Sequence, residues 1–175
     1  MLLNSNKNAG IVVDIGYKST RFVPYYMGYK LSHAVMSELL AGREVQKFKD
    51  INILIEPNRL NRKVMPSSLS KLIISTIEYC DEEIQEDLYS NIILTGQVAK
   101  DMALAKSLGK DMKNKRPNKT ILIFTPPNEY YNWYCASQIA LQKNADLGKF
   151  QFVSQRDFNN NPDIIYYPRI YINEQ

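Results

Sequence analysis

The most informative stretch of this sequence is GIVVDIG, residues 10–16, an apolar run closed by a glycine. Such a run predicts a strand that is buried on both faces and followed by a turn. Residues 19–24 and 25–31 predict two further short strands, with the second turning at Gly28. The pattern therefore indicates an antiparallel meander, and we expect it to lead into a helix at 34–40, capped by Ser32 and ended by Gly42.

The rest of the chain alternates predicted helices and strands. Residues 46–65 are the least regular part and hold one strand-like patch, at 51–55. Helices are expected from Ser67 and from Asp81, and strands, helices and a basic loop follow at 91–94 (strand), 98–108 (helix), 110–119 (loop), 120–125 (strand) and 131–141 (helix). This order predicts an α/β fold, a mixed sheet flanked by helices.

The composition bounds the size of the protein and its chemistry. A chain of 175 residues, 45% hydrophobic and 23% charged, fits one compact globular domain. The net charge of +4 is too small and too scattered to predict specific nucleic-acid binding. His33 is the single histidine, and Cys80 and Cys135 are not at zinc-finger spacing, so no metal site is expected.

The sequence offers no signal for membrane insertion or secretion. No apolar run approaches the roughly 18 to 20 residues that a transmembrane helix needs. Residues 1–10 lack the apolar core of a secretory signal. Two thiols in unlike contexts favour a reducing compartment, so we expect an intracellular protein without a transmembrane segment.

Four blocks of residues, in order and over nearly the whole chain, resemble the second half of actin. The first holds GIVVDIG itself, and the third joins a double proline to an aromatic helix. The matching residues are Gly10–Gly16, Val23-Pro24, Gly28-Tyr29, Leu31, His33-Ala34 and Leu40–Arg43; Ile77–Asp81, Ile84, Asp87–Tyr89, Asn91 and Leu94–Gly96; Pro126-Pro127, Tyr131, Trp133 and Ser137; and Val153–Gln155 with Asp157 and Pro162.

This resemblance implies a ribonuclease-H-like fold of the actin-like ATPase superfamily. It covers one subdomain, the one numbered three in actin, so residues 1–175 are expected to form a single actin-like domain. Residues 46–65 then correspond to a shortened remnant of the subdomain four insertion. The first domain of actin has no counterpart in the sequence, which suggests a truncated actin-like protein.

In the actin family, ATP lies between two domains and each domain supplies a phosphate loop. The resemblance places Asp14 and Gly16 at the start of the second loop, while Lys18 stands where the family has glycine. A lysine brings a Cβ into the space that a phosphate needs. Tyr17 replaces the second aspartate of the loop, so a carboxylate of the metal shell is lost. Asp14, Gly16 and Lys18 are therefore expected to be vestigial phosphate-loop positions.

The adenosine side of the site departs from the family in the same way. Gly96 keeps the first glycine after its strand, but Gln97 replaces the second, and Tyr130 replaces a lysine. We interpret Gly96 and Tyr130 as vestigial adenosine-loop positions. The expectation is a protein that is not an enzyme and holds no cofactor.

The leading hypothesis is a non-catalytic actin-like structural subunit, a scaffold of pseudo-ATPase type within a larger multiprotein assembly. Its partners would be other protein subunits, including a second actin-like chain. The sequence has 12 tyrosines and one tryptophan, residue types that are favoured at protein interfaces. The interface candidates are Tyr134, Tyr166, Tyr167, Arg169 and Tyr171.

Two alternatives stay open. The first is a regulator that binds or caps actin filaments by mimicking part of an actin protomer. The second is a nucleotide-binding switch that a partner chain completes. The compartment also stays open between the cytoplasm with its cytoskeleton and mitochondria, where the chain would belong to an organellar complex.

Overall fold

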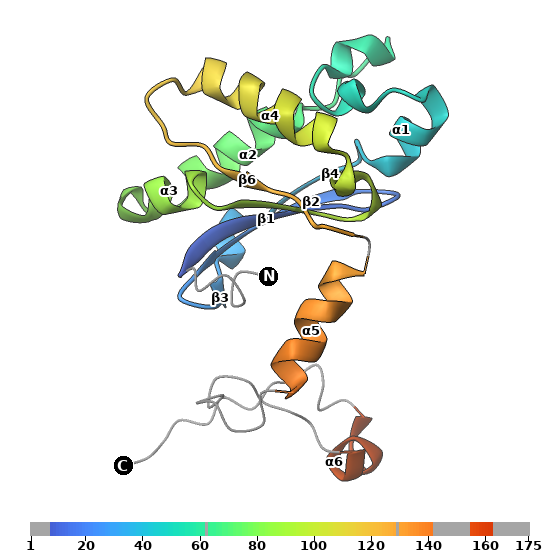
Figure 1. Ribbon diagram of the computed structural model, residues 1–175, viewed down its shortest axis with the longest axis vertical. Helices are drawn as coiled ribbons and strands as arrows, with labels where there is room; N and C mark the ends of the chain where they lie inside the picture. Colours follow the sequence, from blue (N-terminus) through green and yellow to red (C-terminus); the bar gives the residue numbers. More distant parts are fainter. Residues whose placement is uncertain (1–7, 62, 129, 142–154, 163–175) are drawn as a thin grey trace. The chain divides into compact units, whose positions relative to one another are not determined.

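The computed structural model describes residues 8–61, 63–128, 130–141 and 155–162 (Figure 1). The chain divides into two compact units, residues 1–135 and 136–175, and each is described by itself. In the described part of the chain no helix is both long and apolar enough to cross a membrane.

The first unit is built on one mixed sheet. Its described strands lie in the order β3-β2-β1-β5-β6, and β4 pairs with β2 beside this path. β1 is antiparallel to β2 and parallel to β5, while β5 is parallel to β6. The strands are β1 (Ala9–Ile15), β2 (Thr20–Tyr26), β3 (Tyr29–Lys30), β4 (Met36–Glu38), β5 (Ile92–Thr95) and β6 (Ile123–Phe124).

The predicted meander is confirmed by β1, β2 and β3. β1 covers the GIVVDIG stretch, and its register sets Val13 opposite Phe22 on one side and Leu94 on the other. Because side chains alternate along a strand, these three point to the same face of the sheet. All three are fully buried, so this face of β1 and its neighbours forms the floor of the core.

Four helices lie together on one side of this sheet (Figure 1). Apolar side chains spaced three and four residues apart make one stripe on each of the longer helices, and that stripe packs on the sheet. On α2 the buried stripe holds Leu69, Ile73 and Ile77, as the spacing predicts. The helices are α1 (Gly42–Phe48), α2 (Leu69–Glu78), α3 (Glu82–Tyr89) and α4 (Met102–Lys115). The predicted fold class, a mixed sheet flanked by helices, is confirmed.

The helix expected at 34–40 is wrong. The segment instead forms a 3-10 helix, Ser32–Ala34, and then β4, which sets Met36 opposite Phe22 of β2. β3 pairs with only the end of β2, so the start of β2 has an open edge that β4 fills. Pairing across the sheet therefore overrides a weak local helix preference. Gly42 begins α1 and does not end a helix.

The strand-like patch at 51–55 is also wrong. Residues Ile51–Leu54 form a 3-10 helix whose first turn is capped by Asp50, since its Oδ1 accepts the Asn52 N–H at 2.9 Å. Ile53 and Leu54 are buried against the core. A short apolar run does not distinguish a strand from a helical turn, so only the buried side chains were predictable here.

The basic segment expected as a loop lies mostly on α4. This helix starts later than predicted, where Asp101 Oδ1 accepts the Ala103 N–H at 2.8 Å, and it continues to Lys115. Most basic groups of the segment 110–119 have partners. Lys115 bonds Asp111 at 2.5 Å, Lys113 donates to the Lys119 carbonyl at 2.8 Å, Arg116 pairs with Glu78 and Lys119 pairs with Glu86.

α5 (Tyr131–Leu141) agrees with its predicted bounds and crosses from the first unit into the second. Within the second unit, the structure describes the end of α5 and α6 (Gln155–Asn160). The tyrosine-rich C-terminal stretch lies outside the described residues.

Candidate functional site

The end of β1 and the turn that leads to β2 carry the three predicted phosphate-loop positions. Asp14 is exposed near the end of β1, and the Gly16 N–H donates to the Ser19 carbonyl at 3.1 Å. Tyr17 is 60% exposed, and Lys18 is exposed beside it. The turn is therefore a short, main-chain-bonded hairpin that presents an aromatic and a cationic side chain to solvent.

The start of α1 holds this turn in place. The N–H groups of Gly42 and Arg43 donate to the carbonyls of Gly16 and Tyr17, each at 2.9 Å. A Cβ on Gly42 would lie 3.1 Å from the Gly16 carbonyl oxygen, so glycine permits this close approach. Gly42 and Arg43 belong to the LAGR motif that resembles actin. Their contact with the turn was not predicted, because Gly42 was expected to end a helix at 34–40 and not to begin one.

The first turn of α1 also contains a buried carboxylate. Glu44 is 2% exposed, its Oε2 accepts the Ala41 N–H at 3.4 Å, and its Oε1 accepts the Arg43 guanidinium at 3.0 Å. A buried charge with a cation and a main-chain donor around it is satisfied locally. Glu44 therefore anchors the helix that holds the turn.

Gly96 directly follows β5 and lies against the end of β1. Its φ of +97° is in a region that side chains rarely adopt, and a Cβ there would lie 2.2 Å from the Ile15 carbonyl oxygen. The backbone after β5 thus passes directly against the end of β1. Asp14 and Thr95 are register partners in the parallel pair β1–β5, so the two predicted loops meet at one edge of the sheet.

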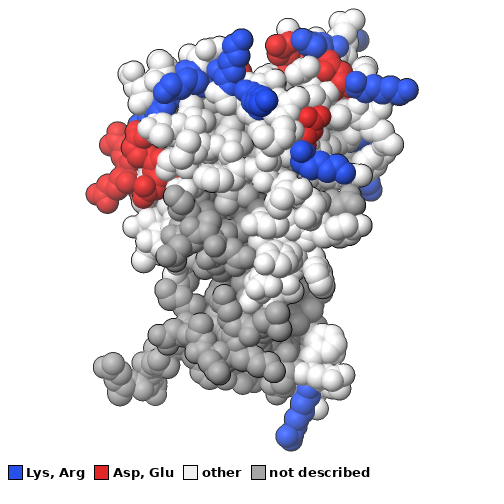
Figure 2. Space-filling model, in the orientation of Figure 1, with Lys and Arg blue, Asp and Glu red and all other residues white. Residues whose placement is uncertain are grey.

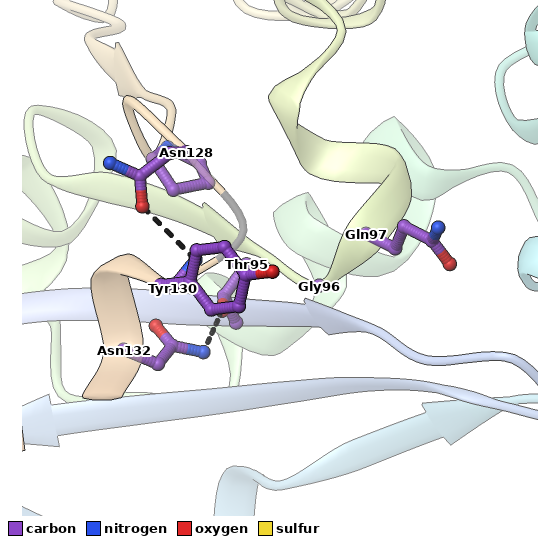
Figure 3. A pocket seen from close by; sticks show the side chains of 7 residues that line it. Thr95, Gly96, Gln97, Asn128, Tyr130 and Asn132 are labelled. Carbon is purple, nitrogen blue, oxygen red and sulfur yellow. Dashed lines mark hydrogen bonds between the residues drawn. The ribbon is translucent and has the colours of Figure 1, made fainter. Parts of the chain in front are cut away.

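A cavity of about 450 Å³ opens at this edge, where β5 and β6 end. Two hydrogen bonds shape its wall: Asn132 Nδ2 donates to Thr95 Oγ1 at 2.6 Å, and the Tyr130 N–H donates to Asn128 Oδ1 at 3.0 Å. Figure 3 shows the Tyr130 ring near Asn132, with Gln97 on the far side of Gly96. The lining residues carry amides and hydroxyls without a charged side chain: Thr95, Gly96, Gln97, Pro126, Asn128, Tyr130 and Asn132.

The cavity brings together the two predicted adenosine-loop positions, Gly96 and Tyr130. The phosphate-loop positions Asp14, Gly16 and Lys18 do not line it and stay on the neighbouring turn. The amides of Asn128 and Asn132 were not predicted. Their place beside Pro126-Pro127 was the available signal, because a chain that leaves a strand there must turn at the sheet edge.

The first turns of α5 expose aromatic side chains next to this cavity. On α5 Trp133 is 73% exposed and Tyr134 49%, and Tyr130, directly before the helix, is 68% exposed. Tyr134 stacks on Tyr131 with ring centroids 6.1 Å apart. The pKa of Tyr131 is raised, first by its interaction with the neighbouring Cys135 thiol and then by burial. Of the predicted interface residues, Tyr134 is described, whereas Tyr166, Tyr167, Arg169 and Tyr171 lie outside the described residues.

Charged side chains of both signs lie on the surface of the first unit (Figure 2). Figure 2 shows acidic side chains gathered over α3 at the left and mixed signs near the upper right. The described residues contain no group of three or more His, Cys, Asp or Glu side chains that could hold a metal. Cys80 and Cys135 are both buried, and burial raises the pKa of the Cys80 thiol.

Comparison with known proteins supports the resemblance found in the sequence. No family model matches the chain. It is 28% identical to an actin-like protein of Neurospora crassa over 128 residues, which are 69% of this chain and 31% of that relative. The chain thus spans about a third of the curated relative that it matches. The sheet and its flanking helices agree with this match, which makes the shared part of the chain similar to an actin-like protein.

Proposed function

We propose that this chain is a non-catalytic, actin-like structural subunit of a larger multiprotein assembly. The observation that carries the proposal is the set of exposed aromatic side chains on α5, led by Trp133 at 73%. Large aromatic residues contribute much of the binding energy of protein interfaces, and several of them exposed close together are typical of an interaction surface. These aromatic side chains lie near the carboxyl ends of β5 and β6, where the resemblance to actin would put the nucleotide.

The residues at that edge support a degenerate nucleotide site. A phosphate loop needs backbone groups that approach the ligand closely, and Tyr17 and Lys18 place two large side chains on the turn. Asp14 supplies the acidic side chain of the turn, without a second carboxylate beside it in GYKS. The cavity next to it is lined by uncharged groups, which suits neither phosphate charge nor a metal ion.

The test is the native mass of the tagged chain in its own cells, with identification of the proteins that purify with it. A stoichiometric complex of high mass supports the proposal. A chain that runs at its own monomer mass contradicts it. A chain that is recovered only with actin supports the filament regulator instead, and slower actin elongation in the presence of the pure chain would confirm that reading.

A matched pair of variants sharpens this test. Trp133→Ser removes the most exposed aromatic side chain of α5, and Tyr79→Ser removes one that is 68% exposed at the end of α2. Loss of an interface hot spot should lower the recovery of partner subunits by roughly tenfold or more. Tyr79→Ser should leave recovery within about twofold of wild type. Equal effects of the two variants would contradict a role for the α5 surface.

A second candidate is the nucleotide-binding switch completed by a partner chain. The cavity favours it, because Gly96 and Tyr130, which the resemblance puts at adenosine-loop positions, both line it. Denaturing the native complex and analysing the released small molecules decides between the two. About one nucleotide per chain would support the switch, and its absence would support the structural subunit.

A further inference from the structure

In the described part of the chain, the sheet ends at β6. Among the strands that the structure describes, β6 is the last in the order β3-β2-β1-β5-β6, and it pairs with β5 on one side only. An edge strand presents a row of unpaired N–H and C=O groups to whatever lies beside it. Natural proteins usually protect such an edge with charge, proline or a bulge.

The hydrogen bonds of Leu122, the residue directly before β6, show which neighbouring backbone groups face outward. The Leu122 N–H donates to the Tyr89 carbonyl at 3.2 Å, and the Leu122 carbonyl accepts the Ile92 N–H at 3.1 Å. Successive residues of a strand turn their backbone groups to opposite sides. In a trans peptide bond the C=O and the following N–H point in opposite directions. The Ile121 C=O and the Ile123 N–H therefore point away from β5, toward the open edge.

The side chains along this edge are apolar and uncharged. Leu122 is 48% exposed and Phe124 45%, while Ile121 and Ile123 pack partly on the core. From Thr120 to Asn128 the sequence has no charged residue. The lysine before this stretch, Lys119, is paired with Glu86. The edge therefore lacks the charge that would repel another strand.

We propose that the edge of β6 receives one extended, uncharged strand from a neighbouring subunit of the assembly, an inference that rests on the proposed function. The outward groups of Ile121 and Ile123 specify a peptide backbone in the strand conformation, since a helix satisfies its own backbone groups. Exposed Leu122 and Phe124 specify apolar side chains at alternate positions of that strand. The absence of charge from 120 to 128 specifies an uncharged one.

The experiment compares two substitutions at Ile123 in the tagged full chain. Ile123→Pro removes the outward N–H without touching a bond to β5, because proline is tolerated where the N–H of an edge strand faces away from its sheet. Ile123→Ala loses the same packing on the core but keeps the N–H. Ile123→Pro should lower the recovery of the neighbouring subunit by at least about threefold relative to Ile123→Ala, as expected for one backbone hydrogen bond or more.

Melting of the isolated variants shows whether Ile123→Pro folds as well as Ile123→Ala. If it does not, amide hydrogen exchange of the wild-type chain replaces the comparison. The Ile123 amide should exchange at least about tenfold more slowly in the assembly than in the isolated chain. Equal exchange, or equal recovery of two folded variants, overturns the inference and leaves the proposed function standing. A wild-type chain that runs as a monomer contradicts the proposed function itself.

Discussion

The two faces of the sheet differ sharply, although the same strands make both. On the side of the four helices, Ile11, Val13 and Ile15 of β1 are at most 1% exposed. On the other side of the same strand, Val12 is half-buried and Asp14 is exposed. The alternation shows that the helix-covered face carries the stability of this unit. The opposite face is less constrained by packing, and residues there can change at little cost to the fold.

The neighbouring strands repeat this difference, with one exception. In β2, Phe22 is fully buried, whereas Arg21 is exposed and Val23 half-buried. In β5 every residue is buried on both faces, including Ile93 and Thr95. β5 lies between two parallel partners, and strands of that kind are commonly covered on both sides. The difference between the faces is therefore greatest at β1 and β2.

The largest expected effect tests this difference directly. Phe22→Ala should lower the free energy of unfolding by about 4 kcal/mol, because it leaves a cavity under the helices. Val23→Ala, one residue along on the opposite face, should cost about 1 kcal/mol. Denaturation in urea measures both. Similar losses for the two variants would show that the opposite face is packed as tightly as the covered one.

The next effect tests the close contact between Gly96, after β5, and Ile15, at the end of β1. Gly96→Ala should cost about 3 kcal/mol or more, since its φ of +97° and ψ of +169° belong to a region essentially restricted to glycine. The added Cβ would also lie 2.2 Å from the Ile15 carbonyl oxygen. The matched control is Gly28→Ala.

Gly28 has a φ of +83° but nothing within 4 Å of an added Cβ, so its replacement should cost only about 1 kcal/mol. Thermal unfolding of both variants gives the comparison. If Gly96→Ala were no worse than Gly28→Ala, the end of β5 would not be held against β1, and the geometry assigned to this edge would be wrong.

Much of the fold was predictable because its signals are local. The apolar run that became β1, the stripe on α2 and the aromatic helix α5 all depend on neighbouring residues in the sequence. β4 was missed because its strand conformation comes from pairing Met36 with Phe22, a contact between segments that periodicity cannot reveal. The 3-10 helix Ile51–Leu54 was missed because a short buried run fits two conformations.

The site was predictable only in part, for a related reason. The resemblance to actin predicted that Gly96 and Tyr130 are adenosine-loop positions. That role stays a prediction, and both residues line one cavity. Asn128 and Asn132 reach that cavity because the carboxyl ends of the parallel strands β5 and β6 meet at one edge of the sheet. No local pattern marks an asparagine for such a place, so its contact with Thr95 required the folded chain.

The smallest effect concerns Asp50, which caps the 3-10 helix Ile51–Leu54. Hydrogen bonding of Asp50 to the Asn52 backbone, with a further contribution from Arg59, lowers the pKa of the Asp50 carboxyl below its ordinary value of 3.8. A lowered pKa in the folded state means that the contribution to stability is present above pH 4 and is lost as the pH falls through the folded-state pKa.

Asp50→Asn should therefore flatten the pH dependence of unfolding below about pH 4, measured by urea denaturation at a series of acidic pH values. The free energy of unfolding above pH 4 should fall by less than about 1 kcal/mol, because the carboxylate is partly open to solvent. Glu56→Gln is the control, since its carboxylate pairs with the same Arg59 but does not cap the 3-10 helix. An effect of Asp50→Asn as large as that of Phe22→Ala would mean that polar contacts, and not the apolar floor beneath them, hold this side of the sheet together.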